Sequence, residues 1–139
     1  MAISRTFTIV KPTAYKNGNL GKILTIIEEH GFSLKALKIL RLSVNQAEKF
    51  YDIHKDRPFF KDLVDYMSSG TVAVAILEKD NAVEAYRELI GSTDPSKART
   101  GTIRNLFGTS IQANAVHGSD SDENAIIEGN FFFKESEIV

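Results

Sequence analysis

The sequence has no cysteine, no long apolar run and almost no net charge. Without cysteine there is no disulfide framework and no thiolate chemistry, which is consistent with a protein of a reducing, intracellular compartment. The longest uninterrupted apolar run, 72–77, is far shorter than the roughly 20 residues that a membrane helix needs. The run FTIV near the N-terminus is too short for the core of a signal peptide. We therefore expect a cytoplasmic protein that has no membrane partner.

Several functional motifs are missing too. No GxxxxGK[ST] is present, because GNLGK at 18–22 has the wrong spacing for a phosphate-binding P-loop. The HRD and DFG signatures of protein kinases are also absent. The three histidines, His30, His54 and His117, are too scattered to predict a zinc site. A net charge of −1 gives no reason to expect nucleic acid as a partner.

The length and the local patterns predict one domain, 1–139, of the α+β class. We predict strands at 6–10, 32–42, 71–78 and 114–117. We predict helices at 20–29, 43–55, 58–67, 81–90 and 121–130. Around the two middle helices the order is strand–helix–strand twice, which is the βαββαβ pattern of a ferredoxin-like fold. The expected architecture is therefore a four-stranded antiparallel sheet with helices on one face.

The segment 92–108 shows no periodicity and is predicted to be one long loop. A compact domain seldom carries a structureless loop of about this length without a function. Arg87 and Arg104 bracket the loop, and guanidinium groups match phosphate oxygens in a bidentate manner. A solvated basic surface explains the same charges, as it does Lys11 at the end of the first strand. The charges alone leave both interpretations open.

His117 ends the last predicted strand, directly before Gly118 and the first residues of a helix. A histidine with local hydrogen bonds is the simpler interpretation. However, the strand–turn–helix junction presents the imidazole at the edge of the sheet, where Gly118 allows close approach. Glu128 lies about two turns into the last helix, and its carboxylate could hold one ring nitrogen protonated while the other acts as a nucleophile or base.

Two adjacent aromatic residues, Phe59 and Phe60, stand in polar surroundings. Both could belong to the core. Alternatively, one is core and the other is an exposed platform on which a planar base stacks, whatever its identity.

In this order, these segments resemble nucleoside diphosphate kinase over essentially the whole chain. The resemblance rests on TFTIVKPTA (6–14), YDIHKDRPFF (51–60), SSGTVAVAILEKDNAVEAYRELIGSTDP (68–95), GTIR (101–104) and NAVHGSDSDENA (114–125). The NxxHGSD segment with a downstream glutamate is specific. The resemblance implies an enzyme that moves the γ-phosphoryl group of a nucleoside triphosphate such as ATP to nucleoside diphosphates. The implied mechanism is ping-pong, through a phosphohistidine, and it maintains the pools of nucleoside triphosphates.

The resemblance also implies roles for individual residues. His117 would be the nucleophile, oriented by Glu128 with Ser119 near it. Lys11 and Tyr51 would complete the catalytic set. The nucleotide would be bound by Lys11, Phe59, Leu63, Arg87, Thr93, Arg104, Ile111 and Asn114. Mg²⁺ would arrive on the nucleotide phosphates, and the chain would form hexamers or tetramers built from dimers.

Four positions depart from the family pattern. They are Thr13 in place of aspartate, Thr100 in place of proline, Leu106 in place of an acidic residue and Ala113 in place of arginine. None is a predicted catalytic position, so we expect effects on loop rigidity and on oligomer contacts. Alternatives to the enzyme are a silent nucleotide-binding scaffold, a nucleic-acid binder and a protein-histidine phosphotransferase.

Overall fold

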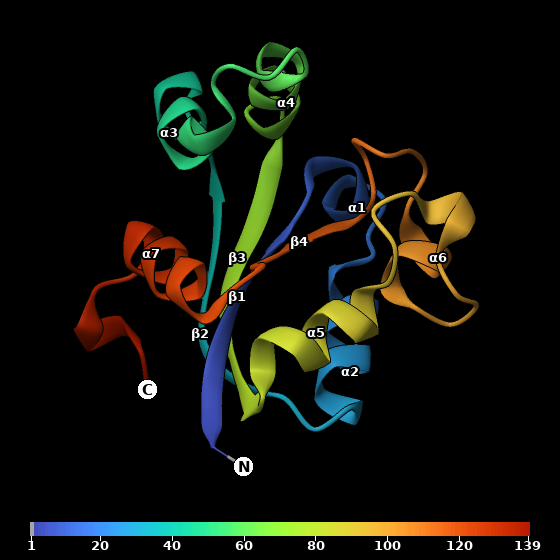
Figure 1. Cartoon of the computed structure of the whole chain (residues 1–139), viewed down its shortest axis with the longest axis vertical. Helices are drawn as coiled ribbons and strands as arrows, with labels where there is room; N and C mark the ends of the chain where they lie inside the picture. The colour runs from blue at the N-terminus through green and yellow to red at the C-terminus, as the bar shows by residue number, and fades with distance from the viewer. Residues whose placement is uncertain (1) are drawn as a thin grey trace.

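An antiparallel four-stranded sheet forms the centre of the chain in a computed structural model that describes residues 2–139 (Figure 1). The strands are β1 (Ile3–Val10), β2 (Ser33–Arg41), β3 (Thr71–Asp80) and β4 (Val116–Gly118). Their order across the sheet is β2-β3-β1-β4, so β3 and β1 pair in the middle. The predicted ferredoxin-like α+β fold is therefore confirmed, with β4 as a short edge strand.

Within residues 2–139, seven α-helices surround the sheet. They are α1 (Pro12–Lys16), α2 (Leu20–Glu29), α3 (Val44–Phe50), α4 (Phe60–Met67), α5 (Ala82–Ile90), α6 (Ile103–Phe107) and α7 (Asp122–Phe132). Single 3₁₀ turns occupy Asp52–His54, Pro95–Lys97 and Glu135–Glu137. Side-chain caps fix where some of these helices begin. The Ser43 hydroxyl accepts from the Gln46 N–H in a capping box, and the Ser121 hydroxyl accepts from the Asn124 N–H.

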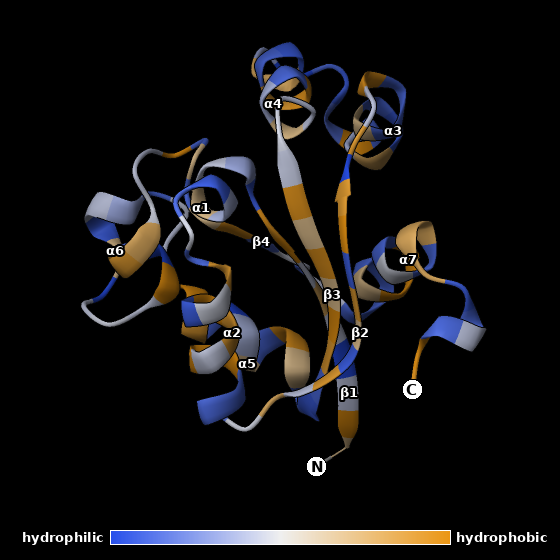
Figure 2. Cartoon of the chain, turned by 180° about the vertical axis from the view of Figure 1, so that it is seen from behind, coloured by the Kyte–Doolittle hydropathy of each residue, from blue (hydrophilic) through white to orange (hydrophobic). Residues whose placement is uncertain are grey.

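The helices pack on both faces of the sheet, so the prediction that they cover one face was wrong. Successive residues of β3 alternate between two cores, with Ala73, Ala75 and Leu77 in one and Val72, Val74 and Ile76 in the other. The first core includes residues of α2 and α5, and the second includes residues of α3 and α4. Figure 1 shows α7 across the sheet from α2 and α5, and Figure 2 shows hydrophobic colours along the middle of β3.

The prediction that 92–108 is structureless was also wrong. The segment contains a 3₁₀ turn and α6, which has five residues and is therefore too short to show helical periodicity. The Thr102 hydroxyl caps α6 by accepting from the Asn105 N–H. The helix predicted at 43–55 ends at Phe50 and continues as a 3₁₀ turn. The fourth strand begins at Val116, two residues later than predicted, because Ala115 has φ of 78° and cannot extend it.

The residues 99–102 form a tight turn at the position where the family pattern has proline. The Thr102 N–H donates to the Arg99 carbonyl at 3.1 Å, and Gly101 adopts φ of 92°. This combination is typical of a type II turn, which favours proline at its second residue, Thr100. No hydrogen bond from the Thr100 N–H is present within residues 2–139.

We expect Thr100→Pro to raise the free energy of unfolding by about 0.4–1 kcal/mol, because it restricts the unfolded chain at little cost to the folded turn. Urea denaturation measures the change. Thr109→Pro is the control, because the Thr109 N–H donates to the Ala113 carbonyl at 2.9 Å and its loss should destabilise the protein. An unchanged or lower stability of Thr100→Pro would contradict the assignment of the turn.

Candidate active site

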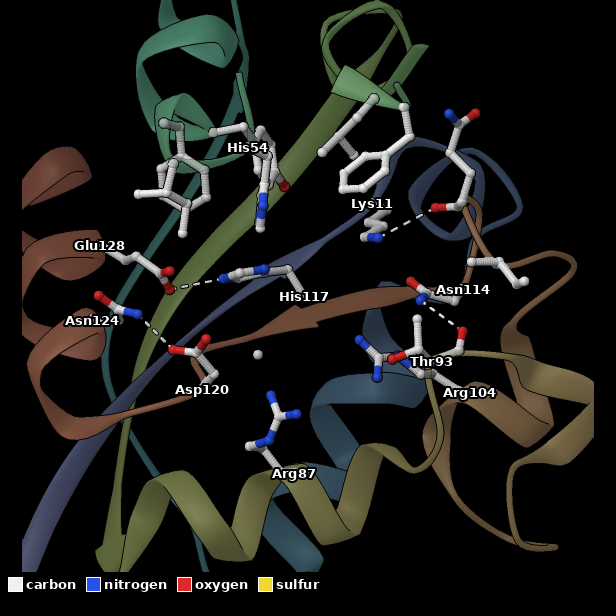
Figure 3. A pocket seen from close by; sticks show the side chains of 18 residues that line it. Lys11, His54, Arg87, Thr93, Arg104, Asn114, His117, Asp120, Asn124 and Glu128 are labelled. Atoms are coloured by element: carbon white, nitrogen blue, oxygen red, sulfur yellow. Dashed lines mark hydrogen bonds and ion pairs between the residues drawn. The ribbon is translucent and has the colours of Figure 1, made fainter. Parts of the chain in front are cut away.

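A cavity of about 470 Å³ opens where β4 ends, between α5, α7, the turn after α3 and the segment 92–114 (Figure 3). All the predicted site residues except Ser119 line it. These are Lys11, Tyr51, Phe59, Leu63, Arg87, Thr93, Arg104, Ile111, Asn114, His117 and Glu128. Ser119 is fully buried behind the cavity wall. The fold therefore gathers side chains from distant parts of the sequence around one space.

The His117 imidazole projects from the edge strand β4, and its side chain is 20% exposed. His117 pairs with Ile9 of β1, which holds its backbone against the middle of the sheet. The Phe50 ring and the imidazole pack in a T-shaped arrangement, with the ring centroids 5.6 Å apart. Its Nε2 lies 2.8 Å from Glu128 Oε1 on α7.

Two groups orient the Glu128 carboxylate. Its Oε1 accepts from the Ser119 hydroxyl at 2.6 Å and from the His117 Nε2 at 2.8 Å. The Ser119 N–H in turn donates to the Phe7 carbonyl of β1 at 3.2 Å. An ionised carboxylate only accepts hydrogen bonds, so Nε2 carries the proton. The Nδ1 of His117 therefore keeps its lone pair, and it has no hydrogen-bond partner within residues 2–139.

Two buried cations lie across the cavity from Glu128. Burial, with the nearby charge of Arg104, lowers the pKa of Lys11 to about 7. Its Nζ makes one long hydrogen bond, 3.3 Å to the Gln112 carbonyl. Burial also lowers the pKa of Arg104 to about 10, and the charge of Arg87 adds to the effect. The site thus holds cations in a desolvated position, which favours an anion as the occupant.

Backbone carbonyls hold the Arg104 side chain in place. Its Nη1 donates to the Gly91 carbonyl at 3.1 Å, and its Nη2 donates to the Val116 carbonyl of β4 at 3.0 Å. Arg87 is exposed on α5, and it makes no ion pair within the described part of the chain. Figure 3 shows Lys11 and Arg104 on the side of the cavity away from Glu128, and Arg87 rising from α5 below His117.

A strained turn joins Asn114 to β4. The Val116 N–H donates to the Asn114 carbonyl at 3.0 Å around Ala115, whose φ of 78° is typical of a rare γ-turn. Asn114 is buried, and its Nδ2 donates to the Thr93 carbonyl at 3.0 Å. This turn fixes the Asn114 side chain at the cavity wall, and strain of this kind tends to cluster at functional sites.

Apolar side chains form the outer rim. Phe59 is 47% exposed, and Ile111 is also exposed. The Phe59 ring lies 5.6 Å from the His54 ring. Phe60 is partly buried and packs against the core. The structure therefore agrees with the alternative in which one phenylalanine belongs to the core and the other is an exposed platform for a base. Leu63 lies one helical turn beyond Phe59 and completes the rim.

Four buried polar side-chain atoms in residues 2–139 have no hydrogen-bond partner, and three of them belong to residues that line this cavity. They are Tyr51 OH, Arg104 Nε and Asn114 Oδ1. Burial raises the pKa of Tyr51, and the charge of Glu128 adds to the rise, so its hydroxyl keeps its proton. Unpaired buried polar atoms are rare in folded proteins, and their clustering here is expected of a site that binds a polar ligand.

Sequence reasoning missed five of the lining residues, which are Phe50, Ile53, His54, Gln112 and Asn124. Gly118 and Asp120 also line the cavity. Gln112 accepts a hydrogen bond from Lys11 through its backbone carbonyl, so the identity of its side chain could not predict this contact. Asn124 donates to the Asp120 carboxylate at 2.6 Å, four residues away.

The nucleoside diphosphate kinase family model matches residues 4–138. A nucleoside diphosphate kinase of Flavobacterium psychrophilum is 55% identical, covering 96% of each chain. One of Granulibacter bethesdensis is also 55% identical, over 100% of this chain and 99% of its own.

Solved structures agree with the sequence relatives. The Aquifex aeolicus nucleoside diphosphate kinase superposes with a TM-score of 0.97 at 48% identity, covering 99% of this chain and 100% of that one. A Halobacterium salinarum nucleoside diphosphate kinase in complex with CDP gives a TM-score of 0.94 at 35% identity, covering 99% and 92%. The predicted family and enzyme class are confirmed, and the chain belongs to the nucleoside diphosphate kinase family of phosphotransferases.

Proposed function

We propose that this chain transfers the γ-phosphoryl group of a nucleoside triphosphate to nucleoside diphosphates through a phosphorylated His117. The observation that carries the proposal is the pairing of His117 Nε2 with Glu128 at 2.8 Å, which leaves Nδ1 as a nucleophile beside buried cations. A nucleophile, an orienting carboxylate and a desolvated cationic wall are the parts that phosphoryl transfer needs.

In the first half-reaction the Nδ1 lone pair forms a bond to the γ-phosphorus. The bond from that phosphorus to the β–γ bridging oxygen breaks, its electron pair stays on the oxygen, and the diphosphate leaves. Positive charge develops on the imidazole ring, and the Glu128 carboxylate stabilises it through the proton on Nε2. In the second half-reaction a terminal oxygen of another diphosphate attacks the phosphorus, and the nitrogen–phosphorus bond breaks.

The cations and polar groups position the nucleotide. Lys11, Arg87 and Arg104 contact the phosphates and spread the charge of the transferred group. The Tyr51 hydroxyl, which has no partner among the described residues, is available to a phosphate oxygen. Asn114 Oδ1, also unpaired in that part of the chain, accepts from a sugar hydroxyl, with Thr93 beside it.

The base lies on the apolar rim. Phe59 provides an exposed ring, and Leu63 and Ile111 flank it. Stacking on an aromatic ring is worth about 1–3 kcal/mol per base and tolerates every base, because each has a π-face. The site therefore accepts purine and pyrimidine nucleotides alike, as a general enzyme of nucleotide pools requires.

Mg²⁺ fits this site as an ion bound to the nucleotide phosphates. Two carboxylates line the cavity, Asp120 and Glu128, and His117 and Ser119 engage Glu128. Within residues 2–139 no three acidic, histidine or cysteine side chains gather where they could hold an ion. When bound, Mg²⁺ supplies charge neutralisation to the phosphates.

The chain should work as a homo-oligomer in the cytoplasm, as a hexamer or tetramer built from dimers. Strand β2 is an edge of the sheet, and two of its apolar side chains, Leu37 and Ile39, are exposed. An exposed edge of this kind is a ready template for pairing with another chain. No described helix combines the length and the apolar character needed to cross a membrane.

We expect His117→Ala to abolish phosphorylation of the protein by ATP and to lower turnover by at least about 1,000-fold, because the nucleophile is gone. Intact mass after exposure to ATP should show one phosphoryl group on the wild type, lost in acid and stable in base. His30→Ala is the control, because His30 lies outside the cavity at the end of α2. A fully active His117→Ala protein would refute the assignment.

We expect the affinity for ADP to fall as the pH rises from about 7.5 to 9, because phosphate binding requires the Lys11 ammonium. With a pKa of about 7, the lysine of the unliganded protein is mostly neutral in this range and must take up a proton to bind. Well below pH 7 the ammonium is already almost fully charged, so Lys11 should add no further pH dependence there. The slope approaches about 1.4 kcal/mol per pH unit, or tenfold in the dissociation constant.

Isothermal titration calorimetry of the wild type and of Lys11→Met measures this dependence. Arg104, with a pKa of about 10, remains largely charged across the range and does not account for the slope. The slope should flatten in Lys11→Met. Parallel curves for the two proteins would show that Lys11 does not carry the pH dependence.

We expect sedimentation velocity to show an oligomer for the wild type and a lower association state for Ile39→Glu. The glutamate places a charge on the β2 edge, where pairing would bury it. Ile3→Glu is the control, because Ile3 is also an exposed apolar residue but lies on β1, an interior strand. A monomeric wild type would contradict the proposed assembly.

A further inference from the structure

A buried pair of hydroxyl groups lies behind His117, on the side of the sheet away from α7. The Thr8 hydroxyl of β1 donates to the His117 carbonyl at 2.7 Å. The same hydroxyl oxygen lies 2.7 Å from the Tyr86 hydroxyl of α5. Thr8 is 1% exposed and Tyr86 is fully buried, so water does not compete for these bonds.

The direction of both hydrogen bonds follows from their chemistry. A carbonyl oxygen only accepts, so the single proton of the Thr8 hydroxyl points to His117. The Tyr86 hydroxyl must then donate to the Thr8 oxygen. Burial raises the pKa of Tyr86, so the tyrosine keeps the proton that it donates. The two hydrogen bonds therefore form a chain, here called the relay, in which Tyr86 donates to Thr8 and Thr8 donates to the backbone carbonyl of His117.

The His117 backbone needs this support because β4 is weakly held by the sheet itself. The strand has three residues, lies at the edge and starts directly after the strained turn at Ala115. The Tyr86 ring also packs under the glycine that follows His117. A methyl group added to Gly118 would come within 3.2 Å of the Tyr86 ring and 2.9 Å of Ile90.

We propose that Thr8 and Tyr86 are positioning residues, which hold the His117 backbone so that its imidazole meets the nucleotide phosphate in line. The inference rests on the proposed function and deepens it, since neither hydroxyl belongs to the cavity lining. The hydrogen bond to Glu128 sets the orientation of the His117 imidazole and keeps the proton on Nε2. The hydroxyl pair of Thr8 and Tyr86 instead sets the position of the His117 backbone. Loss of the relay therefore slows the chemical step and leaves nucleotide binding intact.

The chain contains a matched control for Thr8. Thr6 lies two residues earlier on β1, on the same face of the strand, and is also 1% exposed. Its hydroxyl has no hydrogen-bond partner among the described residues. Thr6→Val and Thr8→Val thus make the same chemical change in the same strand, but only Thr8→Val removes a bond to His117.

The experiment measures kcat, KM and the single-turnover rate of His117 phosphorylation by ATP. We expect Thr8→Val to lower kcat and the single-turnover rate by roughly tenfold, because small misplacements of reacting groups slow reactions strongly. The KM for the nucleotide should change by less than about twofold, which is the pattern of a lost transition-state interaction. Thr6→Val should match the wild type, and Thr8→Ser should restore the rate.

Tyr86→Phe and the double variant Thr8→Val/Tyr86→Phe separate positioning from stability. In Thr8→Val the Tyr86 hydroxyl is buried without a partner, and the second substitution removes it, so the melting temperature should recover. The rate should not recover, because His117 still lacks its donor. A kcat of Thr8→Val within twofold of Thr6→Val, or a rate that recovers with stability, would overturn the inference. A wild type that ATP does not phosphorylate would instead refute the proposed function.

Discussion

The hydrogen bond between His117 Nε2 and Glu128 determines what the site can do. It joins an edge strand to the last helix, which are otherwise separate parts of the site, and it decides which ring nitrogen keeps its lone pair. The bond is possible only because Ser119 fixes the carboxylate and because β1 fixes both Ser119 and His117. An unsupported carboxylate on a helix surface would remain solvated and would not select a tautomer.

The second constraint is the cost of burying cations. Burial lowers the pKa values of Lys11 and Arg104, so the cavity wall holds these charges at a cost in free energy. In the proposed function the nucleotide phosphates relieve this cost and offer an acceptor to the Tyr51 hydroxyl, and a sugar hydroxyl donates to Asn114 Oδ1, both of which are unpaired within residues 2–139. In the proposed function, binding of the nucleotide phosphates offsets the free energy that burying these two cations costs the fold.

The departures from the family pattern lie around the site without altering its lining. The Thr13 hydroxyl accepts from the Tyr66 hydroxyl at 2.7 Å, which ties α1 to α4. Thr100 occupies a turn position that proline also fits. Leu106 is exposed on α6, and nothing in the structure explains this choice. The Ala113 carbonyl accepts from the Thr109 N–H, a bond that does not depend on the side chain.

The sequence by itself determined the order of the four strands and the family, because strand periodicity and motif spacing are local properties of the chain. The resemblance to the family named the candidate site residues, and the short helices α1 and α6 were not predicted. The prediction for the segment 92–108 was wrong because α6 is too short to show helical periodicity. The prediction that helices cover one face of the sheet was wrong because a strand that is buried on both faces does not indicate which elements cover each face. Only the tertiary structure showed that Nδ1 of His117 has no hydrogen-bond partner within residues 2–139 and that the Thr8 hydroxyl donates to the His117 carbonyl. Both observations depend on contacts between residues that lie 11 and 109 positions apart in the sequence. Such contacts form because the fold brings the residues together, and the spacing of residues along the sequence does not predict them.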